Sequence, residues 1–444
     1  MNKVKNKMKK SQIKSIKARE ILDSKGRPTI EVVLTTNLGK FLAALPSGTS
    51  RGKYEAMEKP AKIAIKNVNQ IICPKLKGKD PSRQKEIDEF LIKLDNTKNK
   101  SYLGANAILG VSIAVCRAGA KDMNLSLWQW LAFLSHQKPR LPIPSILMIE
   151  GGLHGRGVEI QEFMVAPEAD TFKERFQTGK KIYQRLRIIL KKKFGSSGVV
   201  LGQEGAFTPK IEKTEKVLDL LLEAIGEEDK SSSSPTEALA EVKKRTKFSS
   251  NFAAARVNET AAKEKIKIIL DAAASSFFKK NRYHLEGKIF DRKKLLDFYL
   301  KLCQKYPILA IEDPFSQEDW QGWKKISSKF KVQSSKFLII GDDLTVTNPK
   351  RIELAHKNKT SNAVIIKPNQ IGTVTETIEA AKLAKSFGWK IMVSHRAGET
   401  KDDFISDLAV GLGADFIKAG APSREERMVK YNRLVRIEEE LCQN

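Results

Sequence analysis

The chain has 444 residues, of which 41% are hydrophobic and 7% aromatic, values typical of a globular protein long enough for two domains. No apolar stretch approaches the roughly 20 residues that a membrane-spanning helix needs, so we expect no membrane segment. The net charge of +28 raises the question of nucleic acid, but the lysines are spread along the whole chain without clustered arginine and aromatic residues, so a nucleic-acid partner is not expected.

Residues 1–14, MNKVKNKMKKSQIK, form a basic run that we interpret as a solvated tail. No apolar core follows this run, so it lacks the pattern of a secretory signal. The four cysteines are widely scattered without Cys-x-x-Cys spacing, which argues against a disulfide framework and against a zinc site. A cytoplasmic location is therefore expected.

A small α+β domain is predicted for residues 15–138. Alternating apolar and polar residues in REILDSKGRPTIEVVLTTNLGKFLAAL, with turns at Lys25–Pro28 and Asn37–Gly39, predict a β-meander. Residues 60–135 have the apolar spacing of helices. The loop PSGTSRGKYEA (46–56) lacks the glycine spacing of a P-loop, and we interpret it as a mobile lid. The proline-rich segment KPRLPIP marks the end of this domain.

The second domain, residues 139–444, contains six short apolar runs: IKIILD, ILAIED, FLIIGD, AVIIK, KIMVSH and DFIK. Such continuous apolar character is typical of buried parallel strands. Each run ends in or beside one ionisable or metal-binding residue, namely Asp271, Glu312, Asp342, Lys367, His395 and Lys418. Because strand ends converge at one mouth of a β/α barrel, we predict an α/β protein with a barrel whose active site lies at this rim.

Helical patterns separate these strands and support repeated βα units. Leu295, Tyr299 and Leu302 recur on one predicted helical face with Phe298, and Asn348-Pro349 has the pattern of a helix start. Thr373-x-x-Glu376 predicts a capping box, with Gly388 as the helix stop. The polar, serine-rich residues 226–262 lack this periodicity, and we interpret them as a surface insertion.

Asp271, Glu312 and Asp342 end three successive strands. Carboxylates gathered at one rim repel one another unless a cation lies between them, and an all-oxygen ligand set favours Mg²⁺ over zinc. Each acid taken singly has another explanation, as a helix cap or as the partner of a surface lysine. Three successive strand ends of the same kind favour the metal site.

Two lysines, Lys367 and Lys418, also stand at the ends of apolar runs. An ordinary lysine is protonated at neutral pH, but a nearby dication disfavours the ammonium form. We expect one of Lys367 and Lys418 to act as a base and the other to hold an anionic group. Surface lysines are the alternative in so lysine-rich a chain, but the position of these two in apolar strands favours function.

Three further segments contain polar residues that we expect in the site. In SHRAGET (394–400), His395 stands beside Arg396, whose guanidinium matches a phosphate or carboxylate. Gln161-Glu162 begins the apolar segment QEFMVAP, and Glu204 lies in the glycine-containing loop GVVLGQEGAF, a position suited to a general acid. Either acid could instead be a solvated turn residue.

These motifs together resemble the enolase family over nearly the whole chain. The matching segments are PSG-S-G-YEA, LDNTKNKSYLGANAILGVSIAV, GGxH, QEFM, IEDPFSQEDW, GDDLTVTNPKRI, IIKPNQIGT and SHRAGET. The resemblance implies an enolase-type barrel whose first two strands are antiparallel, a smaller N-terminal α+β domain, a homodimer and two Mg²⁺ ions. It also implies a small-molecule reaction, the reversible dehydration of 2-phosphoglycerate to phosphoenolpyruvate in glycolysis and gluconeogenesis.

The resemblance assigns a role to each matching position. It implies Lys367 as general base and Glu204 as general acid, with Glu162 supporting the leaving hydroxide and His395 at the catalytic rim. The implied metal ligands are Asp271, Glu312, Asp342 and, in the lid, Ser50. The implied substrate contacts are His154, Gln161, Arg396, Ala397 and Lys418.

Several positions depart from the family pattern. Ala397 replaces the serine of SHRSGET, GDEGGFAP has become GQEGAFTP with Gln203 and Ala206, and Arg51 replaces a threonine in the lid. Around His154, the family's Asn, Ser and Ala positions are occupied by Leu147, Glu150, Leu153 and residues 155–157. These departures leave two alternatives to an active enolase. One is a catalytically weak enolase-fold protein with a binding role. The other is a different acid lyase of the superfamily, although such relatives usually pair lysines as KxK and Lys367 stands alone in IIKPNQ.

Overall fold

The computed structural model describes residues 11–48, 52–226, 265–333 and 336–443. The insertion predicted at 226–262 lies outside the described residues except for Gly226, and so do Ser50 and Arg51 of the predicted lid. Of the predicted basic tail, residues 1–10 also lie outside. Ser11 and Ile13, in contrast, are buried, and the Ile13 amide donates to the Lys79 carbonyl at 2.9 Å, so this end of the predicted tail packs onto the N-terminal domain.

The N-terminal domain begins with the predicted meander, an antiparallel sheet of β1 (Ser15–Leu22), β2 (Pro28–Thr36) and β3 (Gly39–Ala44). The helical stretch predicted for residues 60–135 is confirmed as α1 (Ala61–Lys66), the π-helix η1 (Asn67–Ile72), α2 (Cys73–Leu76), α3 (Gln84–Asp95), α4 (Ala105–Asp122) and α5 (Leu127–Ser135). Helix α4 packs against β2, and Gly110 allows this approach because a Cβ there would lie 2.6 Å from Val32 Cγ2.

Eight strands close into a barrel: β4 (Ile143–Glu150), β5 (Glu162–Pro167), β6 (Ile266–Asp271), β10 (Ile308–Glu312), β11 (Leu338–Gly341), β12 (Ala363–Ile366), β13 (Lys390–Ser394) and β14 (Phe416–Lys418). Strand β5 runs antiparallel to both neighbours, β4 and β6, whereas the other neighbouring pairs are parallel. The barrel whose first two strands are antiparallel is therefore confirmed.

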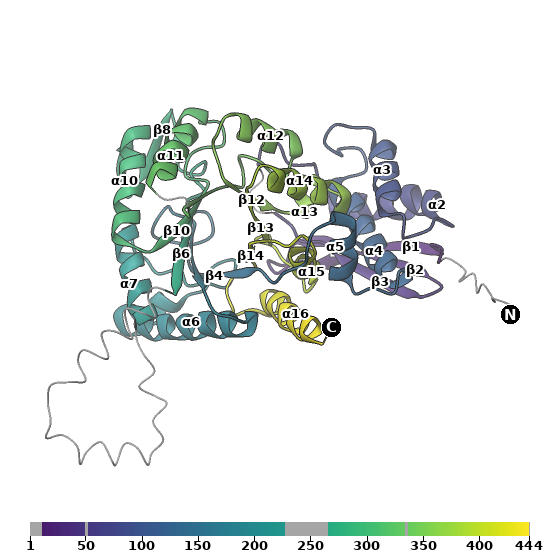
Figure 1. The fold of residues 1–444 in the computed structure, drawn as a ribbon, viewed down its shortest axis with the longest axis horizontal. Coiled ribbons are helices and arrows are strands. Elements are labelled where there is room, and N and C mark those ends of the chain that lie inside the picture. The colour runs from purple at the N-terminus through teal and green to yellow at the C-terminus, as the bar shows by residue number, and fades with distance from the viewer. Residues whose placement is uncertain (1–10, 49–51, 227–264, 334–335, 444) are drawn as a thin grey trace, which may run out of the picture.

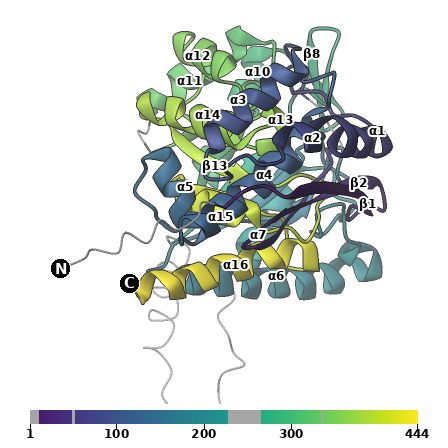
Figure 2. The same ribbon diagram turned by 90° about the vertical axis from the view of Figure 1, so that its right-hand side faces the viewer.

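Helices surround this barrel (Figure 1). They are α6 (Phe172–Phe194), α7 (Thr214–Gly226), α10 (Arg292–Lys305), α11 (Trp320–Gln333), α12 (Pro349–Lys357), α13 (Pro368–Ile371), α14 (Val374–Ser386), α15 (Phe404–Gly411) and α16 (Glu425–Cys442), with the 3-10 turn η2 (Gly195–Val199). A small sheet of β7 (Phe278–Lys279), β8 (Arg282–Leu285) and β9 (Lys288–Phe290) precedes α10. Helices α6 and α16 lie side by side in both views (Figures 1 and 2).

The predicted helix boundaries are confirmed in three places. Asn348 caps α12 with Pro349 in its first turn, and Thr373 accepts a hydrogen bond from the Glu376 amide at the start of α14. After the end of α14, Gly388 has a φ of +73°, a conformation that glycine adopts without strain. None of the helices in the described ranges is long and apolar enough to cross a membrane.

The N-terminal domain is fixed to the barrel by partly buried polar contacts. Arg117 of α4 forms an ion pair with Asp402 at 2.7 Å, and Lys100 pairs with Glu376 of α14 at 2.9 Å. The segment after β3 reaches the barrel mouth, where the Ser47 amide donates to the Gly398 carbonyl at 2.7 Å. These contacts place the N-terminal domain beside the strand ends.

Candidate active site

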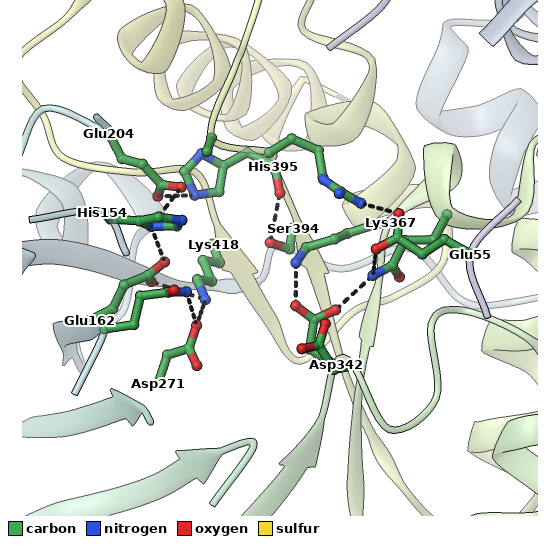
Figure 3. Close-up of a pocket in the computed structure, with 15 residues that line it drawn as sticks. Glu55, His154, Glu162, Glu204, Asp271, Asp342, Lys367, Ser394, His395 and Lys418 are labelled. Carbon is green, nitrogen blue, oxygen red and sulfur yellow. Dashed lines mark hydrogen bonds and ion pairs between the residues drawn. The ribbon is translucent and has the colours of Figure 1, made fainter. Parts of the chain in front are cut away.

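The six predicted strand-end residues lie at one mouth of the barrel. Asp271, Glu312 and Lys418 are the last residues of β6, β10 and β14, and each of the other three follows its strand by one residue, namely Asp342, Lys367 and His395. All but Glu312 line one pocket, which Figure 3 shows in close-up. Glu312 is fully buried behind this lining.

Strand β5 brings Glu162 to the same mouth from the opposite direction. Because β5 is antiparallel, its first residue, rather than its last, stands at the rim, opposite Asp271 of β6. Gln161, which directly precedes β5, points its Nε2 toward Asp271 Oδ2 at 3.4 Å. The pair Gln161-Glu162 predicted from QEFM is therefore part of the pocket lining.

Lys418 is held by three carboxylates. Its Nζ lies 3.0 Å from Asp271 Oδ2, 2.9 Å from Glu312 Oε2 and 3.0 Å from Glu162 Oε2. Burial would lower the pKa of this lysine, but Asp271 and the two glutamates outweigh burial and raise the pKa well above its usual value. The ammonium group therefore stays charged and lies where the acids of β5, β6 and β10 converge.

Lys367 and Asp342 form the other side of the pocket (Figure 3). The Lys367 ammonium forms a direct ion pair with Asp342 Oδ2, and Gln370 Nε2 donates to Asp342 Oδ1 at 2.9 Å. The Lys367 amide donates to Thr347 Oγ1 at 2.9 Å, which fixes the backbone at the end of β12. The structure thus brings Asp271 and Glu312 together around Lys418 and places Asp342 against Lys367.

Glu204, His395 and His154 form a chain of polar contacts with Glu162. His395 Nε2 lies 2.9 Å from Glu204 Oε2, and His154 Nδ1 lies 3.5 Å from Glu204 Oε1 and 3.7 Å from Glu162 Oε1. All four side chains are buried. Glu204 lies in the predicted loop, between the end of η2 at Val199 and the start of α7 at Thr214.

Burial and the nearby Arg427 shift the pKa values of the groups in this series of polar contacts. Burial, together with Arg427, lowers the pKa of His395 to about 4, so the imidazole is neutral at pH 7. Arg427 Nη1 lies 2.5 Å from His395 Nδ1, which leaves the ring proton on Nε2, facing Glu204. Burial alone would raise the pKa of Glu204, but His395 and His154 reverse this and hold it well below its usual value. Burial raises the pKa of Glu162 well above its usual value despite the opposing charge of Lys418.

Arg396 is buried at the pocket and faces an acid of the N-terminal domain. Its Nη1 lies 3.0 Å from Oε2 of Glu55, a residue of the predicted lid segment. A Cβ at Gly48 would lie 2.0 Å from Arg396 Nη2, so the guanidinium fits because residue 48 is glycine. Ala397 also lines the pocket, and its carbonyl accepts from Arg427 Nη2 at 2.7 Å.

The sequence interpretation missed several lining residues. Glu55, Gln370, Asp343 and Ser394 stand inside motifs that it quoted, beside residues that it assigned: YEA, KPNQ, GDD and SHR. Arg427 was missed because it comes from α16, far from any strand end. Glu150 ends β4 just as Asp271 ends β6, so the strand-end pattern could have identified it.

The acids at the mouth fit a hard divalent cation. Asp271, Glu312 and Asp342 offer only oxygen ligands, Glu312 Oε1 is buried without a hydrogen-bond partner, and the Lys418 ammonium already occupies part of this cluster as a cation. Among the described residues, the groups whose ligand atoms all lie within 4.8 Å of one another are the triads Asp313–Asp342–Asp343 and His154–Glu162–Glu204, and Asp271, Glu312 and Asp342 do not form such a group. In the second triad, His154 lies between the two acids, 3.7 Å from Glu162 Oε1 and 3.5 Å from Glu204 Oε1. Ser50 lies outside the described residues.

Comparison with known proteins assigns this architecture to a class. Residues 13–131 match the family described as "Enolase, N-terminal domain", and residues 138–232 and 239–444 match "Enolase, C-terminal TIM barrel domain". The two matches coincide with the small α+β domain and with the barrel described above. The chain belongs to the enolase family.

Two curated relatives support this assignment over almost the full length. The chain is 43% identical over 460 residues to "Enolase" of Mastigamoeba balamuthi, an alignment that covers 98% of this chain and 97% of that protein. It is 42% identical over 455 residues to "Enolase 1" of Entamoeba histolytica, covering 97% of this chain and 96% of that protein. The similarity therefore includes both domains and the segment between them.

Proposed function

We propose that this protein is an active enolase, a hydro-lyase that interconverts 2-phosphoglycerate and phosphoenolpyruvate. The observation that carries the proposal is the pocket itself. Lys367 lies on one side of this pocket, Glu162 and Glu204 lie on the other, and the ammonium group of Lys418 lies between them. A binding role does not need both lysines buried among carboxylates, and other acid lyases of the superfamily usually pair lysines as KxK, whereas Lys367 stands alone in IIKPNQ. The departures Ala397, Gln203 and Glu150 change the surroundings of these groups and not the groups themselves.

Lys367 is proposed as the general base that removes the C2 proton. It stands at the end of β12, with its backbone fixed by Thr347 and its ammonium beside Asp342. A lysine base with metal ions stabilising the deprotonated acid is the general chemistry of this superfamily. The fixed position of the side chain supplies the orientation that proton transfer from carbon requires.

Glu204 is proposed as the acid that protonates the departing 3-hydroxide, on the side of the pocket opposite Lys367 in Figure 3. The same group serves as base in the reverse hydration, for which the lowered pKa of Glu204 already provides the carboxylate form. Glu162, whose pKa is raised by burial, lies beside it, and His154 lies between the two acids.

The positive groups are proposed to hold the substrate. Arg396 matches a phosphate through its planar guanidinium, and Lys418 would contact the substrate carboxylate. Asp271, Glu312 and Asp342, with Ser50, are the proposed ligands of Mg²⁺, which when bound supplies positive charge where the carboxylate gains negative charge. Gln161 and the amide of Ala397 complete the contacts that we expect around the substrate.

A direct assay tests the proposal. Purified protein is expected to form phosphoenolpyruvate from 2-phosphoglycerate, with activity lost on chelation and restored by Mg²⁺. Lys367→Ala is expected to remove the activity, and Lys382→Ala is the matched control, because Lys382 is an exposed lysine of α14 away from the mouth. Absence of activity in metal-loaded wild-type protein, or full activity in Lys367→Ala, would contradict the proposal.

The assembly and location are proposed as those implied by the family. We propose that the protein is a homodimer. We also propose that it is cytoplasmic, and this location is supported by the four cysteines, which are all free thiols, as expected in a reducing compartment. Sedimentation velocity tests the dimer, and a monomeric active species would contradict it. Filter binding of RNA at physiological salt tests the expectation that the positive charge serves no nucleic-acid partner.

A further inference from the structure

Glu150, the last residue of β4, is a buried carboxyl group that contacts the loop of Glu204. It is fully buried and stands opposite Glu162 in the register of β4 and β5. Both of its oxygens lie 3.1 Å from the amide nitrogen of Glu204, and Oε1 also accepts from the amide of Ala206 at 2.8 Å. The side chain therefore binds the backbone on which Glu204 is mounted.

Other contacts hold the same loop, but at different atoms. Tyr183 and Ser423 donate their hydroxyl groups to the carbonyl of Gly205, each at 2.7 Å. The Glu204 carbonyl accepts from the Ala421 amide at 3.2 Å. Glu150 is the group that accepts from the amide of Glu204 itself, so it bears most directly on where the Glu204 side chain starts.

The space around Glu150 is shaped to this side chain. A Cβ at Gly202 would lie 2.5 Å from Glu150 Oε2, and a Cβ at Gly155 would lie 2.2 Å from the Glu150 carbonyl oxygen. Because these are glycines, the loop and the end of β4 approach closely enough for the carboxyl group to reach two amides. The contact is therefore a close fit between three segments of the chain.

The charge state of Glu150 suits this position. Burial, and next the adjacent Glu204, raise the pKa of Glu150 to about 8. At pH 7 the group is therefore mainly an uncharged carboxylic acid. It accepts the two amide hydrogen bonds without placing a second negative charge beside Glu204, and glutamine matches it in both shape and charge.

We propose that Glu150 is a positioning residue, whose carboxyl group fixes the Glu204 side chain against His395 by holding the amides of residues 204 and 206. The inference rests on the proposed role of Glu204 in proton transfer. Glu150 itself does not line the substrate pocket. Its loss should therefore affect the chemical step more than substrate binding.

Two substitutions separate hydrogen-bond acceptance from mere filling of space. Glu150→Leu fills the site but accepts no hydrogen bond, and it is expected to lower kcat by about 100-fold, the scale of a 1 Å misplacement, with KM almost unchanged. Glu150→Gln keeps an acceptor oxygen and is expected to retain kcat within about threefold of wild type. If Glu150→Leu does not fold, Glu150→Asp, which retracts the carboxyl group from the loop, is expected to lower kcat in the same way.

Asp88 provides a matched control. It is a fully buried acid with a raised pKa, and it accepts a backbone hydrogen bond from Thr375 at 2.9 Å, but it lies between α3 and α14. Asp88→Leu is expected to lower the resistance to unfolding without changing kcat. This comparison separates loss of a buried hydrogen-bonded acid from loss of positioning.

Hydrogen exchange gives a readout that does not depend on activity. Amide exchange in a peptide covering residues 200–208 is expected to accelerate in Glu150→Leu and to stay at the wild-type rate in Glu150→Gln and Asp88→Leu. Wild-type kcat and wild-type exchange in Glu150→Leu would overturn the inference, as would a Glu150→Gln variant as impaired as Glu150→Leu. If the wild-type protein had no enolase activity, the proposed function would fail, and the exchange rates would still decide the role of Glu150.

Discussion

Replacing Arg427 by methionine tests how the SHRAGET loop is held. Arg427 is fully buried and donates to the carbonyls of Arg396 and Ala397, each at 2.7 Å, and its Nη1 lies 2.5 Å from His395 Nδ1. Methionine fills similar space but donates no hydrogen bond. An unsatisfied buried carbonyl costs about 1–3 kcal/mol, so the two carbonyls together predict a loss of about 2–6 kcal/mol in the free energy of unfolding.

The same substitution should change the titration of His395. Arg427 is one of the causes that lower the pKa of His395 to about 4, so its removal should raise this pKa toward the ordinary value near 6.5. The assay combines urea unfolding with an NMR titration of the histidine ring protons, which is practical because the chain has five histidines.

Arg433→Met is the control for this experiment. Arg433 lies on the same helix and forms ion pairs with Asp407 at 2.7 Å and Glu440 at 2.6 Å, but it does not contact the SHRAGET loop. It should lower stability without changing the titration of His395. The reasoning is refuted if Arg427→Met unfolds with the wild-type free energy and leaves the pKa of His395 near 4.

Two further predictions concern the same side of the pocket. Glu55→Gln removes the carboxylate that faces the buried Arg396 and should lower the free energy of unfolding by about 3–5 kcal/mol in urea titrations. Added inorganic phosphate should reduce this loss. Equal stability of variant and wild type without phosphate would show that the ion pair contributes nothing. His395 has a folded-state pKa of about 4, below the value near 6.5 of the unfolded chain, so protonation favours unfolding as the pH falls from 6.5 to 4. Between pH 6.5 and pH 4, the free energy of unfolding of the wild type should fall by about 3 kcal/mol more than that of His395→Gln, as measured by urea unfolding at each pH. Equal losses in the two proteins would contradict a folded-state pKa of about 4 for His395.

The sequence was sufficient to predict the barrel and most of its mouth. Parallel strands of a barrel direct their carboxyl ends to one side, so a charged residue after each buried apolar run could be placed without knowing any contact. This argument located Asp271, Asp342 and Lys418 correctly at the ends of β6, β11 and β14. Local signals also fixed the helix starts, because a cap such as Asn348 depends on residues close to it in the chain.

Residues that act across the fold could not be located in this way. Glu55 and Arg427 reach the mouth from a loop of the N-terminal domain and from the last helix, and no periodicity relates them to a strand end. The pairing of Lys418 with three acids, and of Lys367 with Asp342, depends on side-chain packing that the strand-end pattern leaves open. The buried Ile13 shows the same limit, since a basic surrounding sequence concealed one residue of the core.

The ion pair between Glu55 and Arg396 has a consequence for how the protein matures. The acid belongs to the first part of the chain to leave the ribosome, and the guanidinium follows the seventh of the eight barrel strands. Neither part of the chain alone contains both members of this ion pair, so a nascent chain should form the pair only after nearly all of its barrel has been synthesised. A truncated chain that ends before Arg396 would then lack the complete pocket and should not bind substrate.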